Sequence, residues 1–471
     1  MRKSILLAMI MVAFVAMPAF ASVQNIKISG GVDSYWAYRE DFDFGYEATT
    51  IGGDKIQNIF FTITSLQVDA DLTDNVTATI ALVNERAWGN DTDATRGLSN
   101  SGAQTDVEID LAFVTLREML YSPLTLVIGR QRLPKYGNGL IVSKGTGVGN
   151  SNLTDVVQDY RGIKAMDAIR AILDYDPLTV EIIYGKFDSN TVAGASEEDD
   201  DVDLYGIQTA YELGDDMNTL VEAYFWAKIN KETTQAAANC DLKPDTVYTP
   251  GLRASTTPIE GLTVSGEIAM QSGTKVISTA RDAENQKRKA MAAEFMATYQ
   301  VPVAEDYNPV VSYDYIYASG DSNPADETSS GEVSRNKWTA WDPMLEGTLG
   351  GSKIFNALFS LTNVHVHSFS LQANPMEDVT SKVVFSKYWL DKETDGTAWT
   401  LNRTDTSGAE VVGAQDDETD LGYAVDLYTT YDYTEDVSIG ALMSWFVPGD
   451  VFSKDNQDAA SQVMVDVNVD F

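Results

Sequence analysis

The sequence predicts an all-β fold, a transmembrane antiparallel β-barrel of about 18 strands with short periplasmic turns and long extracellular loops. Three observations favour it: an alternating C-terminal segment that ends on Phe471, an N-terminal secretory signal, and short turns that alternate with long polar loops. After the signal, no apolar run is long enough for a transmembrane helix. A membrane-spanning form of this chain would therefore cross with strands.

The C-terminal segment from Gln462 to Phe471 alternates with period two. One parity holds Val463, Val465, Val467, Val469 and Phe471, and the other is mainly polar. This spacing is typical of a strand with one apolar and one wet face. A terminal aromatic residue resembles the recognition signal of bacterial outer-membrane barrels. An edge strand of a secreted β-sandwich is the alternative that this segment alone leaves open.

The N-terminal segment has the three parts of a secretory signal. Arg2 and Lys3 precede an apolar run, and Ala19-Phe20-Ala21 supplies a small-x-small cleavage site. The run is shorter than a membrane-spanning helix requires. We expect residues 1–21 to be a signal peptide and residues 22–471 to form the barrel, located in the bacterial outer membrane.

Composition narrows the class of partner. Lys and Arg total 33 against 70 Asp and Glu, a net charge of −37 that argues against binding nucleic acid. Cys240 is the only cysteine, so no internal disulfide can form. The expected partners are outer-membrane lipid and lipopolysaccharide, the barrel assembly machinery, and a small solute or oligosaccharide.

Short turns rich in Asp, Asn, Pro or Gly separate pairs of alternating segments. The eight turns lie at residues 73–75, 121–123, 176–177, 214–216, 258–261, 304–306, 374–377 and 434–436. They define sixteen strands, to which a first strand at about Ile26 to Tyr38 and the last strand at Gln462 to Phe471 are added. The resulting even number, about 18, suits a single-chain barrel in which the first and last strands pair.

Long polar stretches join the strands at the other rim. They include residues 39–58, 88–104, 132–167, 230–248, 319–355 and 392–419. We expect the loops at 132–167 and 319–355 to fold into the pore and narrow it.

Strand parity assigns side chains to lipid or lumen. We expect Val107, Ile109, Leu111 and Phe113 to share the outer face of one strand, and Leu421, Tyr423, Val425 and Leu427 that of another. The polar parity of each strand then faces water inside the barrel.

Charged side chains on the inner parity are candidates for the pore lining. Arg170 shares its parity with Asp174, Arg253 lies between Leu252 and Ala254, and a bulge at Gly129 would turn Arg130 inward. The remaining candidates are Asp33, Arg39, Asp110, Glu222, Glu267 and Asp426. A ring of such charges would select the solutes that pass. The alternative for each is a rim residue that only solvates the barrel end.

No catalytic motif or metal-binding pattern stands out, so we expect no enzyme activity, metal or cofactor. His365 and His367 share one strand face without an evident third ligand, and polar residues near a strand end are the preferred interpretation. The acidic run at residues 197–201 lacks the spacing of a formal calcium loop.

Two segments carry a family resemblance. Residues 129–140, GRQRLPKYGNGL, resemble the G-R-Q motif with a Y-G-x-G end of the alginate export porin family. Residues 341–345, WDPML, followed by Gly350 and Gly351, are similar to a second family element of the type F-D-P-L, with Trp341 in place of Phe. The resemblance implies an 18-stranded outer-membrane barrel.

The functional hypothesis is an outer-membrane porin for passive diffusion or export of small solutes, ions or oligosaccharides. A plugged structural or adhesive barrel is the alternative. An outer-membrane hydrolase is weaker, because no nucleophile and base are paired in the sequence.

Overall fold

The computed structural model describes most of the chain. The described residues are 24–42, 44–45, 56–88, 107–120, 123–143, 160, 165–188, 201–231, 243–278, 283–321, 337–345, 349–393, 399–400, 411–412, 418–452, 454 and 457–471. The expected signal peptide at 1–21, Cys240 and residues 197–200 of the acidic run lie outside them.

Long strands follow one another along the whole chain. They are β1 (Asn25–Glu40), β2 (Ile56–Thr73), β3 (Val76–Ala87), β4 (Glu108–Met119), β5 (Leu124–Gln131), β6 (Met166–Asp174), β7 (Leu178–Asp188), β8 (Val202–Glu212), β9 (Leu220–Asn230), β10 (Asp245–Ile259), β11 (Leu262–Ser278), β12 (Ala283–Gln300), β13 (Val310–Ala318), β15 (Val364–Met376), β16 (Val379–Trp389), β19 (Asp420–Asp432), β20 (Val437–Pro448) and β21 (Ala460–Asp470). Shorter elements are η3 (Glu305–Tyr307), β14 (Lys337–Trp338), α2 (Lys353–Leu358), β17 (Trp399–Thr400) and β18 (Val411–Val412).

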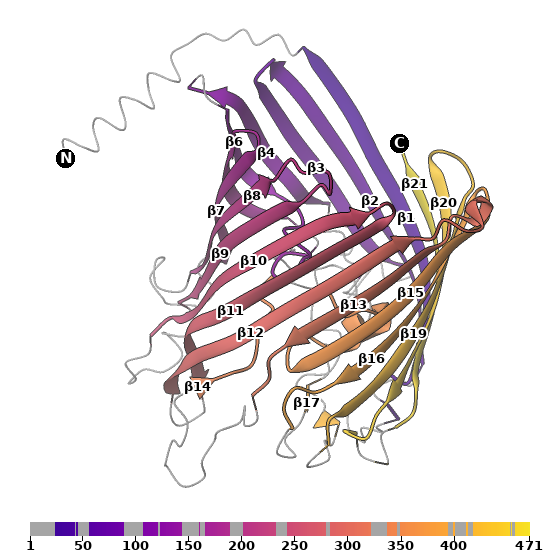
Figure 1. Cartoon of the computed structure of the whole chain (residues 1–471). Helices are drawn as coiled ribbons and strands as arrows, with labels where there is room; N and C mark the ends of the chain where they lie inside the picture. The colour runs from indigo at the N-terminus through magenta and orange to yellow at the C-terminus, as the bar shows by residue number, and fades with distance from the viewer. Residues whose placement is uncertain are drawn as a thin grey trace, which may run out of the picture.

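These 18 long strands form one closed antiparallel barrel (Figure 1). Each pairs with the next, and β21 pairs with β1 along Gly31–Glu40. Phe471 extends this closing ladder, because its N–H donates to the Gly30 carbonyl at 3.0 Å and its carbonyl accepts from the Gly30 N–H. Seven of the eight short turns predicted from the sequence join adjacent strands at one rim, and residues 121–122 of the remaining turn, between β4 and β5, lie outside the described residues. The predicted barrel is confirmed.

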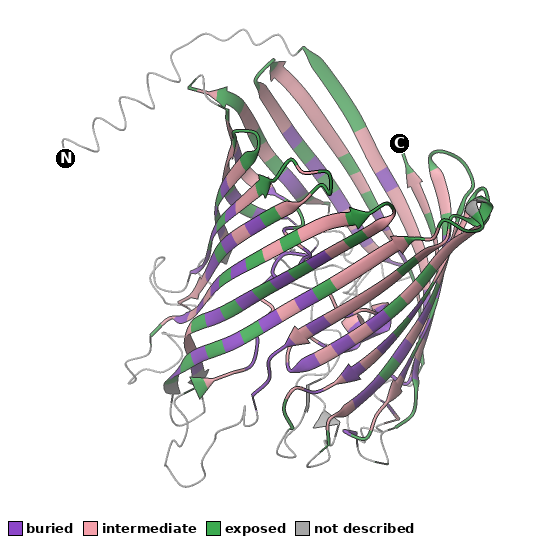
Figure 2. Ribbon diagram, in the orientation of Figure 1, coloured by how far each residue is buried: buried purple, intermediate pink, exposed green. Residues whose placement is uncertain are grey.

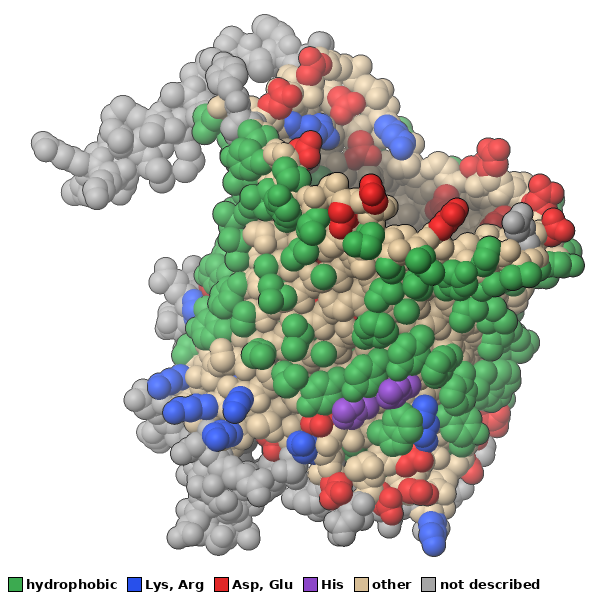
Figure 3. All heavy atoms as spheres, viewed as in Figure 1, with side chains coloured by type: hydrophobic (Ala, Val, Ile, Leu, Met, Phe, Trp, Pro, Cys, Tyr) green, Lys and Arg blue, Asp and Glu red, His purple; other side chains and the backbone are tan. Residues whose placement is uncertain are grey.

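Exposed and buried residues alternate along the strands, as Figure 2 shows for β10 to β12. The exposed parity carries large apolar side chains such as Ile182, Phe225 and Ile268. On the face that Figure 3 shows, apolar side chains form a band between the two rims, and charged side chains are concentrated toward the rims. The outer face is thus suited to lipid.

Two β-bulges change the expected faces. In β4, Ala81 pairs with Leu111 while Leu82 pairs with Ile109, so Asp110 is an extra residue. Leu111 and Phe113 therefore pack inside with Ala81, and their expected outer placement is wrong. A second bulge near Gly422 turns Leu421 inward, where it is fully buried. A bulge moves each following side chain of its strand to the opposite face of the sheet. Alternation read from the sequence alone does not detect it.

No helix among the described residues is long and apolar enough to cross a membrane.

Candidate pore constriction

Two segments that follow β5 and β14 fold into the barrel and meet there. Residues 132–143, which we name loop A, and residues 339–345 with 349–363, together named loop B, are joined by a parallel bridge between Val142 and Leu345. Loop A begins inside the first family-like motif, and loop B contains the second. The described parts of the two loops agree with the expectation that they enter the lumen.

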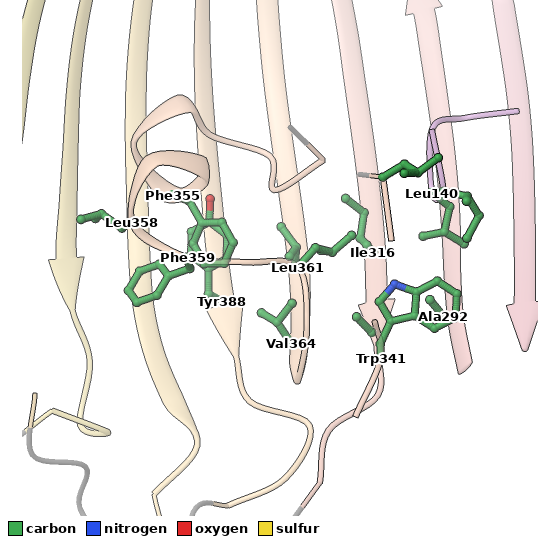
Figure 4. Close-up of a cluster of buried hydrophobic side chains, with 14 of the residues drawn as sticks. Leu140, Ala292, Ile316, Trp341, Phe355, Leu358, Phe359, Leu361, Val364 and Tyr388 are labelled. Carbon is green, nitrogen blue, oxygen red and sulfur yellow. The ribbon is translucent and has the colours of Figure 1, made fainter. Parts of the chain in front are cut away.

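An apolar cluster holds these loops against the wall. Leu140, Trp341 and Phe355 are at most 2% exposed and belong to one buried cluster with Ala292 and Ile316 of the strands. Figure 4 shows these side chains on the inner side of the strands, with α2 packed beside them. The small Ala292 side chain leaves room for the Trp341 ring, so strand residues and loop residues fill this part of the lumen together.

One side of the lumen, which we name the charged wall, carries a row of polar side chains across β6 to β12. Its members are Arg170, Glu181, Gln208, Glu222, Arg253, Glu267 and Glu294. Successive members are cross-strand partners at Glu181–Gln208, Glu222–Arg253, Arg253–Glu267 and Glu267–Glu294. The row therefore runs perpendicular to the strands as a continuous belt.

Two ion pairs lie within this belt. The Arg170 guanidinium donates to Glu181, and the Arg253 guanidinium donates to Glu222. All four side chains are at least 85% buried. Buried charges require such partners because water no longer compensates them.

Loop A is bound to the charged wall through its motif residues. The Tyr136 hydroxyl donates to Glu181 at 2.7 Å, the Asn138 N–H donates to Glu267 at 2.7 Å, and the Arg253 Nε donates to the Asn138 side-chain oxygen at 2.6 Å. Burial, together with the Glu181 carboxylate, raises the pKa of the Tyr136 phenol, which therefore remains a donor at neutral pH.

Glycine is required between these two anchors. Gly137 has φ +59°, and a Cβ there would lie 2.5 Å from a Glu267 carboxylate oxygen. The Y-G-x-G motif thus brings the backbone close enough to the wall for Asn138 to bind Glu267.

The opposite side, which we name the hydroxyl wall, is mostly uncharged. Its buried members are Ser368, Ser386, Asp426, Ser444 and Gln462. The Ser368 and Ser386 hydroxyls are 2.8 Å apart, and Asp426 pairs across strands with Ser444. Only one of the five members carries a charge.

Loop B lies on this hydroxyl wall. The Lys353 N–H at the start of α2 donates to Asp426 at 2.6 Å, and the Tyr388 hydroxyl donates to the Gly350 carbonyl at 2.9 Å. The Phe355 ring stacks on Tyr388 with centroids 4.1 Å apart. Gly351 has φ +77°, and a Cβ there would lie 2.2 Å from the Ser368 hydroxyl oxygen.

The Asp342 residue of the second motif is held by side chains of β11 and β12. The Arg288 guanidinium lies 3.4 Å from the Asp342 carboxylate, and the Gln271 side chain exchanges two hydrogen bonds with the Asp342 backbone. This motif therefore positions loop B rather than reaching a solute.

Most candidate pore residues lie on the buried parity. Besides the members of the two walls, Arg39 is 3% exposed and donates to Gln462 at 3.1 Å. Asp110 is 2% exposed and accepts from Arg132. Asp33 is half-buried nearer the turn rim, in register with Ile63 and Asn468.

Arg130 is the exception, and its expected inward position is wrong. It pairs with the exposed Ala112 and lies 3.8 Å from Asp167, which is 67% exposed. The register of β5 with β6 is continuous through Gly129, so no bulge turns Arg130. The inward residue of the G-R-Q motif is Gln131, whose side-chain amide donates to the Ala168 carbonyl at 2.9 Å.

Several acidic residues of the interior were not selected from the sequence, and three of them are important for the constriction. They are Glu181, Glu294 and Asp314, each in the middle of a strand. A single carboxylate within an otherwise apolar segment, such as Glu294 between Ala293 and Phe295, is the signal that could have identified them.

His365 and His367 lie on the outer parity of β15. Their Nδ1 atoms are each 2.9 Å from a tyrosine hydroxyl, of Tyr315 and Tyr313 respectively. Within the described residues, no group of three or more His, Cys, Asp or Glu is arranged to hold a metal ion.

Solved structures of Pseudomonas aeruginosa proteins have a similar fold. OccK8 (OprE) gives a TM-score of 0.56 at 8% identity over 95% of this chain and 98% of that chain. OccK11 (OpdR) gives 0.55 at 9% over 95% and 96%, and OccD3 (OpdP) gives 0.52 at 12% over 95% and 92%. At these identities the likeness shows the fold alone. The curated proteins contain no matching sequence.

A closed barrel with an apolar outer band and inward loops defines a class of protein, the β-barrel channel for small solutes in the bacterial outer membrane. The family model for alginate export matches residues 29–466. The chain therefore belongs to the alginate export family, as its two motifs indicated.

Proposed function

We propose that this protein is a passive channel, carrying out no reaction, in which loops A and B and the charged wall form the constriction. We further propose that the constriction favours cations and uncharged polar solutes over anions. The observation that carries this proposal is the excess of carboxylates inside. Arg170 and Arg253 are each paired with one carboxylate. Glu267, Glu294, Asp314 and Asp426 are further inward carboxylates, and among the described residues the buried charged side chains are mostly Asp and Glu, with Arg39 and Arg288 as the basic ones.

The acidic interior affects which solutes can pass through the pore. The family is named for alginate, a polyanion, and a pore wall of low dielectric constant focuses the field of its carboxylates on the solute. A polyanion would be repelled at the charged wall, whereas a cation or a neutral sugar would not. We therefore propose that small cationic or uncharged polar solutes, including neutral oligosaccharides, are the cargo.

A plugged barrel, the alternative expected from the sequence, is not favoured by the match to the alginate export family. Planar-bilayer recording separates the two. We expect discrete single-channel currents from the purified protein and, in a KCl gradient, a reversal potential of the sign that K⁺ permeation produces. The preference should weaken near 1 M salt, where the screening length falls to about 3 Å. Absence of current would favour the plugged barrel, and preference for Cl⁻ would contradict the cargo proposal.

We also propose that residues 1–21 are removed on export and that Phe471 is recognised by the barrel assembly machinery. The exposed Phe471 side chain at the end of the closing strand supports this role. Deletion of Phe471 should lower the amount of heat-modifiable barrel in the outer membrane, measured by unheated gel electrophoresis. A Phe471→Tyr variant, which keeps an aromatic terminus, should assemble normally. Equal amounts of wild-type and truncated barrel would contradict the proposal.

A further inference from the structure

The charged wall ends in a pair of carboxylates that have no ion-pair partner among the described residues. Glu294 on β12 points into the barrel beside its cross-strand partner Glu267, and Asp314 lies diagonally from it on β13. Glu294 is 3% exposed, and neither of its carboxylate oxygens has a hydrogen-bond partner. One oxygen of Asp314 also has none. Unpaired buried carboxylates are unfavourable unless a cation or a proton compensates them.

The neighbouring steps of the same wall show how this protein compensates its other carboxylates. Glu181 and Glu222 each have an arginine. Glu267 accepts from the Tyr224 hydroxyl at 2.6 Å and from the Asn138 N–H. The wall thus pairs its carboxylates with guanidinium groups or hydrogen-bond donors up to Glu294, where these partners stop.

Within the described part of the chain, Lys135 is the cation that lies within electrostatic range of the pair. Lys135 of loop A is exposed, and its positive charge acts on both Glu294 and Asp314. Its ammonium group is carried on a flexible stem, so it can leave when another cation arrives. The carboxylates do not converge as metal ligands do, since no metal-holding group is found in the described part of the chain. A hydrogen-bonding cation fits this geometry better than a metal ion.

We propose that Glu294 and Asp314 form a binding subsite for the ammonium or guanidinium group of a permeating solute, with Lys135 as a tethered competitor. This inference rests on the proposed channel function and names one class of its cargo, small amine-bearing molecules. The unpartnered oxygens of Glu294 and Asp314 supply acceptors for such a group. The hydrogen-bonded pair of Arg253 and Glu222 lies further along the same wall.

The test is channel block by putrescine, a small diamine, added to single channels of the full-length protein in KCl. We expect putrescine to interrupt the wild-type current at a lower concentration than it interrupts that of Glu294→Gln. The half-blocking concentration should rise about tenfold or more in the variant, because a charge-assisted hydrogen bond is replaced by a neutral one. The matched control is Glu260→Gln in the exposed β10–β11 turn, which removes the same charge away from the lumen and should leave block unchanged.

A second variant distinguishes the subsite from a folding defect. Lys135→Gln removes the competitor, so putrescine should block at a lower concentration than in the wild type. Opposite shifts in the two variants cannot come from a shared loss of structure. Equal block in wild type, Glu294→Gln and Lys135→Gln would overturn the subsite, as would Ca²⁺ blocking more strongly than putrescine in a Glu294-dependent way. A protein that carries no KCl current would refute the channel function itself, which is a separate result.

Discussion

Both loops share one buried apolar cluster, but the charged wall also binds loop A through carboxylates, whereas the hydroxyl wall holds loop B mainly through apolar packing. Tyr136 and Asn138 bind the carboxylates of Glu181 and Glu267, and each contact depends on a charge that has its own partner. Loop B has comparable contacts from the Lys353 N–H to Asp426 and from Arg288 to Asp342, beside a stacked ring pair and a buried apolar cluster. The difference implies that the two loops can be released separately, one by removing charge and the other by removing volume.

The largest expected effect is release of loop B by Phe355→Ala. This change removes a ring that is 1% exposed and stacked on Tyr388. A buried Phe replaced by Ala costs about 3–5 kcal/mol, and here that cost falls on a helix of six residues whose wall contacts are mainly apolar. We expect trypsin to cleave the folded barrel after Lys353 in α2, a site that is protected in the wild type.

Cleavage is read by mass spectrometry of the gel-shifted barrel. Phe355→Leu keeps most of the apolar volume and should remain largely protected. In Phe355→Ala, loop A should stay uncut after Lys135. Cutting at both loops would show that the two walls do not act separately.

The next effect in size is release of loop A by Arg253→Ala. The change leaves Glu222 without its cation and removes the donor to the Asn138 side chain. Removing one partner of a buried ion pair costs about 3–5 kcal/mol, and the water of the lumen makes the lower end appropriate. We expect new tryptic cleavage after Lys135 and a rise in current noise from the mobile loop, with Lys353 still protected.

Arg253→Lys is the matched variant, because it keeps the charge but loses the second contact of the guanidinium fork. Its loop should be cut at an intermediate rate. If the alanine variant is as resistant as the wild type, the hydrogen bonds of the charged wall do not hold loop A.

The barrel was predictable because period two and turn chemistry are local properties of the sequence. Eight turns and the terminal strands were sufficient to define the strand number. The faces of Leu111 and Leu421 were not predictable by alternation, because each depends on an inserted residue in a pairing with a distant strand. Which partner strand accepts such a bulge is a property of the assembled sheet.

The candidate site was predictable in part for a similar reason. Glu222, Arg253 and Glu267 share a polar parity that each strand shows on its own. Their alignment into one belt depends on the stagger of three strands, which no single segment encodes. Arg130 shows the limit of motif resemblance, since the motif was recognised while its inward side chain is Gln131.

The smallest expected effect concerns ion preference, and it compares two arginines that the sequence alone made equivalent. Arg170 lies on the charged wall with its side chain 14% exposed, while Arg130 is on the outer face beside Asp167. Replacing Arg170 by Ala removes a positive charge from the constriction. A unit charge about 10 Å from the ion path contributes roughly 0.4 kcal/mol at an effective dielectric constant near that of water. This contribution has opposite signs for K⁺ and Cl⁻.

The K⁺ to Cl⁻ permeability ratio, measured from the reversal potential in a KCl gradient, should therefore rise by about fourfold or less in Arg170→Ala. Arg130→Ala should leave the ratio unchanged, and the double variant should match Arg170→Ala alone. Glu181 retains the Tyr136 hydroxyl as a donor in these variants, and Arg253 keeps its contacts with Glu222 and Asn138, so loop A should be cut less than in Arg253→Ala. A shift produced by Arg130→Ala would mean that charge outside the belt controls ion preference. An unchanged ratio in Arg170→Ala would mean that Glu181 already cancels the arginine, leaving the unpaired carboxylates of the same wall to set selectivity.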